Sequence, residues 1–460
     1  MGAVSRLIRK TPGPARRLLW AAVPFARRRS RFYRIWRSFL RASQWWSPEQ
    51  LRAYQLRKLR DTLIYAYEET PYYRCIFDAR GLSPYDMALP GDLARLPVLT
   101  KDDVRAHADD LRAPDAGAFV TLRTSGSTGE PLAIVAPRAI YDIEAAFLWR
   151  AYTAHGTALN DERTAWLRRY AAGDEDPLWY DDHELRRRYL AANRLSPATV
   201  RDYVAAIDAS GARCLSGYPS SLYSLAALLE ENGLALHNVN VCHAASETML
   251  PAWKVAIERA IAPVYCHYGM QERVVFFFQC AYGRYHEAIE YGYAEIVDGQ
   301  VVATGFHNPA MPLIRYATGD TATPAEASVR CPCGRGLPVS VRDFAGRVDD
   351  ILVTPDDRRV PGVNFYTMFY KIPGVRMFKI VQRAPDLVEV QVAPGPGYGA
   401  ATVGWVRQGM RARLGDAVRI VYRRVPEIAR NPRTGKVRCI EGLAKPEGVW
   451  QAHDWRFWRG

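Results

Sequence analysis

A stretch rich in glycine and hydroxyl residues has the composition of an anion-binding loop: Thr124-Ser125-Gly126-Ser127-Thr128-Gly129-Glu130-Pro131. Because glycine has no side chain, Gly126 and Gly129 let backbone N–H groups approach an anion closely, and the hydroxyl groups add donors. The loop therefore suits a triphosphate. It is not a P-loop, because the pattern G-x-x-x-x-G-K-[ST] occurs nowhere in the chain. Taken alone, such a loop is also typical of a plain surface turn.

A second group of residues combines three cysteines with one histidine. Cys280 and His286 are separated by five residues, and Cys331 and Cys333 follow in a Cys-Pro-Cys-Gly turn. Three thiolates and one imidazole form closed tetrahedral zinc sites of the structural kind. We expect a structural Zn²⁺ that joins the loop after Glu272 to the segment before residue 346, the alternative being four unrelated side chains. The other four cysteines are irregularly spaced, so a disulfide framework is not expected.

Four further signatures follow in order: Tyr268-Gly269-Met270-Gln271-Glu272, Tyr316-Ala317-Thr318-Gly319-Asp320, Gly346-Arg347-Val348-Asp349-Asp350 and Asn431-Pro432-Arg433-Thr434-Gly435-Lys436. With the first loop they resemble, in order and spacing, the adenylate-forming acyl-ligase superfamily, and the resemblance covers residues 50–445. Within it the chain is most similar to the phenylacetate-coenzyme A ligase branch and to the CapK-like proteins of capsule biosynthesis. The stretches that support this branch are residues 70–74, 93–101, 217–223 and 245–248, together with the cysteine segments.

The resemblance implies a two-step reaction. A carboxylate attacks the α-phosphorus of ATP to give an acyl-adenylate and pyrophosphate, and a nucleophile then displaces AMP. Lys436 matches the lysine that meets the charge developing at the α-phosphate. Glu272, with Thr128 nearby, matches the ligand of a Mg²⁺ ion that bridges the phosphates.

The same resemblance assigns the ATP contacts. Asp320 matches the carboxylate that accepts the ribose hydroxyls, and Arg347 the cation that holds ribose and phosphate. The remaining ATP-binding candidates are Ser125, Gly126, Ser127, Thr128 and Gly129 around the phosphates and Ser246, Glu247, Tyr268 and Gly269 around the adenine. Singly, each has a structural alternative, since an Asp after Thr-Gly is commonly a turn and a Lys is commonly solvated. The ordered set favours the functional interpretation.

The acceptor of the acyl group is left open. Asp349 matches the hinge about which the small domain swings between the two half-reactions. Residues 351–361 are longer than the corresponding stretch of coenzyme A ligases, which places coenzyme A binding in doubt. We expect coenzyme A or an amine as acceptor, with a lean to the thioester. For the acyl group, Phe276, Phe277 and Phe278 indicate an aromatic-lined pocket or, equally typical, a buried strand.

The elements around these motifs indicate an α/β fold. Helical patterns over residues 47–67, 203–210, 220–232 and 251–260 alternate with apolar runs at 214–216, 239–243 and 264–267. We expect a large ATP- and acyl-binding domain over residues 47–345, with mainly parallel sheets. A small mobile α+β C-terminal domain should follow over 346–445, and then a tail over 446–460.

Composition and charge limit the kinds of partner that the protein can bind. The 460 residues are 48% hydrophobic, which is enough for at least two folded domains. The net charge is +14, but twelve basic residues precede the first acidic residue, Glu49, which leaves +2 for the rest of the chain. A nucleic-acid groove along the protein is therefore not expected.

Residues 1–46 interleave those basic residues with aromatic and aliphatic ones. This pattern predicts either a segment lying on an anionic membrane surface or a partly disordered leader that becomes helical only near Trp36. No run reaches the length of a membrane-spanning helix. We expect a cytoplasmic enzyme, peripheral at the inner membrane face if the first interpretation holds. The alternative is that the protein is not an enzyme but a scaffold at the membrane surface that uses the ligase fold.

Overall fold

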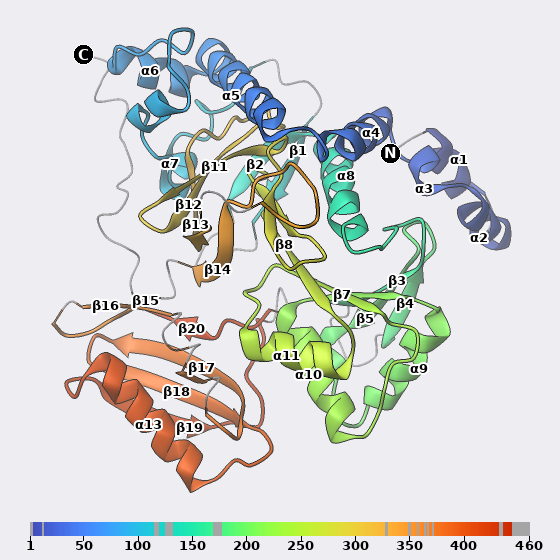
Figure 1. The fold of residues 1–460 in the computed structure, drawn as a ribbon, viewed down its shortest axis with the longest axis vertical. Helices are drawn as coiled ribbons and strands as arrows, with labels where there is room; N and C mark the ends of the chain where they lie inside the picture. Colours follow the sequence, from blue (N-terminus) through green and yellow to red (C-terminus); the bar gives the residue numbers. More distant parts are fainter. Residues whose placement is uncertain are drawn as a thin grey trace.

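The computed structural model describes residues 3–11, 13–114, 119–124, 132–168, 177–326, 330–347, 351–356, 358–362, 365, 368–369, 372–431 and 436–443. Within these residues the chain forms a large α/β unit, and a smaller sheet with one long helix packs beside it (Figure 1). The predicted phosphate-loop residues 125–129 and the hinge residue Asp349 lie outside the described residues.

The large unit is built on one mixed sheet. In the described residues it has twelve strands in the order β11-β12-β13-β14-β10-β9-β8-β7-β6-β3-β5-β4. Their bounds are β3 Thr164–Arg168, β4 Trp179–Asp182, β5 Arg187–Ala191, β6 Cys214–Gly217, β7 Val241–Ala245, β8 Val264–Gly269, β9 Phe276–Gln279, β10 Tyr285–Glu287, β11 Gly292–Val297, β12 Gln300–Gly305, β13 Tyr316–Pro324 and β14 Val341–Arg347.

The α/β class is confirmed, but parallel pairing is less extensive than predicted. It is confined to the neighbours β5, β3, β6, β7 and β8, and all other pairs in this sheet are antiparallel. Parallel strands need long crossovers, and the helices predicted from periodicity supply them. From β8 onward no helix lies between consecutive strands of this sheet in the described residues, and the neighbouring strands are antiparallel.

Helices cover both faces of the parallel part. α9 (Val200–Ser210), α10 (Pro219–Glu231) and α11 (Pro251–Ala260) cross between the parallel strands, and α8 (Ile140–Thr153) packs against the other face with Phe147 beside Phe276. The predicted helices and strands of this region are thus confirmed to within a few residues. Local signals fix their ends: α10 begins with a proline at its first turn, and α9 ends at Gly211, whose φ of +66° suits glycine.

Other elements complete the large unit. The predicted helix at residues 47–67 is α5 (Pro48–Glu69), which begins with a capping box formed by Ser47 and Gln50. The elements that flank it or precede the parallel strands are α6 Pro71–Ala79, α7 Lys101–Ala106, short 3₁₀ helices at Gly91–Arg95 and Ala192–Arg194, and the antiparallel hairpin β1 Phe119–Arg123 and β2 Ala133–Pro137.

The C-terminal part is a second, four-stranded sheet in the order β19-β18-β17-β20. Its elements are β17 Val375–Ala384, β18 Leu387–Pro394, α13 Ala400–Leu414, β19 Arg419–Arg424 and β20 Ile440–Glu441, preceded by the hairpin β15 Ile351–Val353 and β16 Arg359–Pro361. The longer segment noted at residues 351–361 is therefore this hairpin. The predicted small α+β unit is confirmed.

The N-terminal segment is folded. It forms α1 (Ala3–Arg9), α2 (Gly13–Ala22), α3 (Phe25–Arg28) and α4 (Arg31–Ser43), which lie at one side of the large unit (Figure 1). Helix therefore begins well before Trp36, and Tyr33 and Leu40 of α4 are fully buried in a cluster shared with α8. The guanidinium of Arg28 is buried too, bound to the carbonyl oxygens of Trp20 and Val23. No helix in the described residues is long and apolar enough to cross a membrane.

Candidate active site

The candidate site lies where the parallel strands end. β3, β6, β7 and β8 are neighbours, so their carboxyl ends meet along one edge of the sheet. Tyr218 follows β6, Ser246 and Glu247 follow β7, and Tyr268 and Gly269 end β8. Ligands of open α/β sheets bind at this edge. Three of the predicted motifs are thereby brought together.

Tyr268 and Asp320 form a direct pair. The phenol of Tyr268 donates a hydrogen bond to Asp320 Oδ2 at 2.7 Å, and its ring stacks on Phe344 with centroids 4.1 Å apart. Burial and the neighbouring carboxylate raise the pKa of Tyr268 well above its usual value, so it stays a donor. Asp320 follows Gly319, whose φ is +76°, and pairs with Arg347 across β13 and β14. Within the described residues, Asp320 Oδ1 receives no hydrogen bond, which leaves it available to a ligand.

Glu272 is buried at the start of the loop after β8, with 5% of its surface exposed. The phenol of Tyr316 donates to Glu272 Oε1 at 3.0 Å. Among the described residues, nothing donates to Oε2. A carboxylate with one oxygen fixed and the other open suits an oxygen-preferring cation such as Mg²⁺.

Glu247 joins the two sheets. Its Oε2 accepts the backbone N–H of Ser220 at 3.0 Å, at the N-terminus of α10, and its Oε1 accepts the N–H of Val437 at 2.9 Å. Burial raises the pKa of Glu247, and the hydrogen bonds from Ser220 oppose that rise. The arrangement gives Glu247 a structural task that the sequence motifs did not indicate.

Lys436 belongs to the small unit but lies at the edge of the large one. Its Nζ is 5.7 Å from the centre of the Tyr218 ring, and the guanidinium carbon of Arg168 is 5.2 Å from the same ring. Nearby, Arg430 donates to the hydroxyl groups of Ser220 and Ser221 at 3.0 and 3.2 Å. Sequence reasoning missed Arg168, Tyr218 and Arg430. The available signal for Arg168 was a charged residue directly after the apolar run at 164–167.

The phosphate loop and the hinge are the parts of the predicted site that the structure describes least. Ser125, Gly126, Ser127, Thr128, Gly129 and Asp349 lie outside the described residues, as does the side chain of Arg347. The base of the phosphate loop is described: Thr124 and Leu132 close the β1–β2 hairpin through two hydrogen bonds, Thr124 N to Leu132 O at 3.0 Å and Leu132 N to Thr124 Oγ1 at 2.9 Å. Ser246 is exposed and has a φ of +73°, which turns the chain sharply after β7.

The four predicted zinc ligands lie together. The potential ligand atoms of Cys280, His286, Cys331 and Cys333 all lie within 4.8 Å of one another. Cys280 Sγ is 3.5 Å from Cys331 Sγ, and Cys333 Sγ is 3.3 Å from His286 Nε2. His286 Nδ1 is 2.9 Å from the carbonyl oxygen of Leu337, so Nδ1–H donates and Nε2 keeps a lone pair toward the thiols. The donor set and its orientation fit a tetrahedral zinc ion.

Comparisons with known proteins agree with this description. No protein-family model matches the chain. The chain is 21% identical over 324 residues to Protein CapK of Staphylococcus aureus, covering 68% of this chain and 71% of that protein. It is 26% identical over 344 residues to the phenylacetate-coenzyme A ligase of Thermus thermophilus, covering 69% and 74%. A structure of 2-hydroxyisobutyryl-CoA ligase in the postadenylation state, in complex with R3-HIB-AMP, gives a TM-score of 0.64 at 21% identity, covering 85% and 89%.

The fold and these relatives indicate one class: the chain has the fold of adenylate-forming ligases and is distantly related to them in sequence. Within it, the chain is a distant homologue of proteins named CapK and phenylacetate-coenzyme A ligase. The family resemblance drawn from the five motifs is confirmed.

Proposed function

We propose that the chain is an ATP-dependent, AMP-forming carboxylate ligase that makes an acyl-adenylate and transfers the acyl group to coenzyme A. The position of Lys436 carries this proposal. The bond from Val437 N to Glu247 holds the small unit so that Lys436 approaches Tyr218, at the edge where the parallel strands end. A carboxylate and the α-phosphate of ATP meeting there would develop charge beside this ammonium group.

Each described residue has a task in the first half-reaction. Lys436 would stabilise the charge at the α-phosphate, and Asp320, oriented by Tyr268, would accept the ribose hydroxyls. Glu272 and Thr128 would hold a Mg²⁺ ion, which neutralises phosphate charge when bound. Arg347, residues 125–129, Ser246 and Gly269 keep the ATP contacts assigned by the resemblance, and Asp349 keeps its place as the hinge.

The acceptor is proposed to be coenzyme A. Two of the relatives described above are named coenzyme A ligases, and a second structure of 2-hydroxyisobutyryl-CoA ligase, with a TM-score of 0.55, holds CoA with 2-HIB-AMP. The β15–β16 hairpin, which lengthens the chain after the hinge, favours the alternative of an amine acceptor. A place in capsule polysaccharide assembly follows from the CapK likeness and stays a prediction.

Two further assignments belong to the proposal. The Cys280, His286, Cys331 and Cys333 cluster would hold a structural Zn²⁺, which cross-links the turn between β9 and β10 to residues 331–337. The N-terminal helices would contact an anionic membrane surface. Support for the second comes from exposed apolar side chains, Leu7, Leu18 and Ile35, among basic residues with no acidic residue before Glu49.

Acid-dependent pyrophosphate release tests the proposal. The enzyme is incubated with ATP, Mg²⁺ and single aryl, aliphatic or sugar-derived acids, and Lys436→Ala is the comparison. We expect release with particular acids and a loss of about 100-fold or more in Lys436→Ala, because the charge at the α-phosphate is no longer met. Adding coenzyme A or an amine then identifies the acceptor by the product. If ATP does not bind and no acid supports release, the scaffold alternative becomes the better interpretation.

A further inference from the structure

Arg168, the last residue of β3, is a partly buried cation that has no acidic partner among the described residues. Its guanidinium carbon lies 4.8 Å from the ring centre of Trp166 and 5.2 Å from that of Tyr218. Its Nε is buried and makes no hydrogen bond, and across the part of the chain that the structure describes no carboxylate pairs with the side chain. Withdrawing such a charge from water without a partner costs stability.

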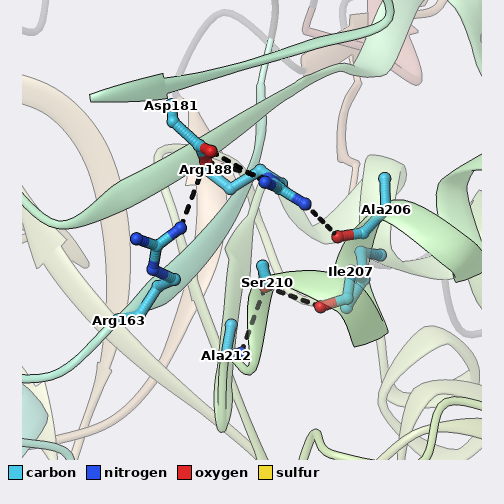
Figure 2. A network of polar contacts seen from close by, with 7 residues as sticks. All are labelled: Arg163, Asp181, Arg188, Ala206, Ile207, Ser210 and Ala212. Carbon is cyan, nitrogen blue, oxygen red and sulfur yellow. Dashed lines mark hydrogen bonds and ion pairs between the residues drawn. The ribbon is translucent and has the colours of Figure 1, made fainter. Parts of the chain in front are cut away.

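Other arginines in the large unit pair with carboxylates. Figure 2 shows Arg188 and Arg163 pointing at the same carboxylate, that of Asp181 on β4, which β5 separates from the strand of Arg168. Arg188 binds both oxygens of Asp181 at 2.9 and 2.7 Å and the carbonyl oxygen of Ala206 at 2.7 Å. Arg150, fully buried, is bound by both oxygens of Glu290. Among the described residues, Arg168 therefore differs from these arginines in having no carboxylate partner, and it lies at the edge of the sheet where the candidate site is placed.

The same face of the sheet carries a polar wall. The register places Trp166, Ser216 and His243 side by side, so their side chains and that of Arg168 share the face covered by α8. His243 Nε2 and His267 Nδ1 are 2.8 Å apart. Tyr152 of α8 stacks on His243 with centroids 3.7 Å apart, and its hydroxyl group bonds Ser216 Oγ at 2.8 Å. These side chains are buried, whereas Arg168 and His267 on the same face are partly exposed.

The hydrogen bond between His243 and His267 determines which ring nitrogen of each carries the proton. Burial lowers the pKa of His267 to about 3, with a further contribution from Arg168, and that of His243 well below its usual value, so both rings are neutral. His243 Nδ1 is buried and has no partner among the described residues. A proton there would be an orphaned buried donor, which proteins avoid, so the proton of His243 is assigned to Nε2, which donates to His267. His267 then carries its own proton on Nε2, away from His243.

Arg168, beside Tyr218, and His267 are therefore both donors, and both side chains lie on the face of the sheet that α8 covers. We propose that the acyl pocket takes carboxylic acids that carry a second carboxylate, with Arg168 binding that second carboxylate and His267 donating to it. The inference rests on the proposed adenylation and names its substrate class as dicarboxylic acids, in place of an unsubstituted aryl acid. A planar guanidinium binds a carboxylate through two parallel hydrogen bonds, which gives a large preference over a neutral group.

Matched pairs of acids test the inference. Succinate is compared with butyrate, adipate with hexanoate and carboxyphenylacetate with phenylacetate, each by kcat/KM for acid-dependent pyrophosphate release. We expect at least one diacid to exceed its partner by about 30-fold, the effect of a charge-assisted bidentate pair. Arg168→Met should lower that ratio at least tenfold, and Arg168→Lys should give an intermediate ratio because it keeps the charge without the planar fork.

Thermal unfolding gives a second readout that separates binding from structure. Arg168→Met should raise the unfolding temperature by a few degrees, because it removes an unpaired partly buried charge. Arg188→Met is the matched control: it should lower the unfolding temperature, since Asp181 loses its partner, and leave the acid ratio unchanged. Equal use of both acids of every pair, or an unchanged ratio in Arg168→Met, would overturn the inference while adenylation stands. If none of the acids supports pyrophosphate release, the proposed function is contradicted, and this inference with it.

Discussion

Glu247 is a single residue that contacts both the large unit and the small unit. Its two oxygens accept backbone N–H groups from α10 and from the residue after Lys436. The first contact places a carboxylate at a helix N-terminus, which favours negative charge. In the proposed swing of the small unit the second contact would be lost, because Val437 would move with Lys436. Glu247 therefore stabilises the arrangement in which Lys436 faces the site.

Asp320 is the residue on which ATP affinity should depend most directly. Its Oδ2 is held by the phenol of Tyr268, and Oδ1 faces the site without a partner among the described residues. Asp320→Asn should weaken ATP binding by about 10- to 100-fold, because hydrogen bonds to a carboxylate are worth roughly 1.5–3 kcal/mol. Tyr268→Phe should weaken it about fivefold, because the carboxylate stays charged but loses its orientation. Equilibrium titration with ATP measures both.

Asp343→Asn is the matched control for this comparison. Asp343 lies on the neighbouring strand β14, is exposed, and pairs only with the equally exposed Arg342 among the described residues. ATP binding should be unchanged in this variant. Affinity that is the same in Asp320→Asn as in the wild type would show that the ribose is held elsewhere.

At the level of elements, the sequence predicted the parallel strands and crossover helices because each carries a complete local signal. α10 and α11 have proline starts and helical periodicity, and β6, β7 and β8 are short apolar runs between them. The five motifs indicated the superfamily by resemblance, and the ATP contacts that they assign stay a prediction. The cysteines and histidine needed no fold knowledge, because thiolate and imidazole in this number are themselves informative.

Other features could not be predicted because they depend on pairings distant in sequence. Arg188 lies beside Asp181 on the neighbouring strand, whereas Arg168 has no such carboxylate among the described residues. This difference arises from strand order and register. The link between Glu247 and Val437 joins residues 190 positions apart. The N-terminal helices were obscured by their charge: Arg28 and Tyr33 are buried through contacts that a basic composition does not indicate.

The proposed zinc site should act as a cross-link between elements. It joins Cys280 and His286, at either end of the turn between β9 and β10, to Cys331 and Cys333. Cys333→Ser should lower the zinc content below one per chain and reduce the unfolding temperature by several degrees, because a ligand and a cross-link are lost together. Elemental analysis and thermal unfolding measure this. Cys75→Ser, outside the cluster, should change neither the zinc content nor its stoichiometry, and wild-type protein without stoichiometric zinc would refute the site.

Across the whole molecule, the N-terminal segment is tied to two distant parts. Ser43 Oγ donates to Glu290, the partner of Arg150, at 2.6 Å within the core. Gln44 accepts the backbone N–H of Gly336 at 3.0 Å, and its side chain accepts Arg335 Nε at 2.9 Å, beside the zinc cluster. Removing residues 1–46 would therefore expose the α8 face and release the cysteine segment. Loss of activity in that deletion would report on folding, so it is a poor test of membrane binding.

Surface substitutions test membrane contact without disturbing these ties. Leu18 and Ile35 are 72% and 59% exposed, so Leu18→Glu with Ile35→Glu should leave the unfolding temperature unchanged. Wild-type protein should co-sediment with vesicles of phosphatidylglycerol and phosphatidylcholine and be released by salt, because the attraction of the basic residues is screened. The double variant should bind about 10- to 100-fold more weakly, since two apolar anchors are lost and two negative charges gained. Val255→Glu, 60% exposed on α11, is the control and should bind as the wild type does. Binding that is equal in the double variant, or equal to vesicles of phosphatidylcholine alone, would refute a membrane role for these helices.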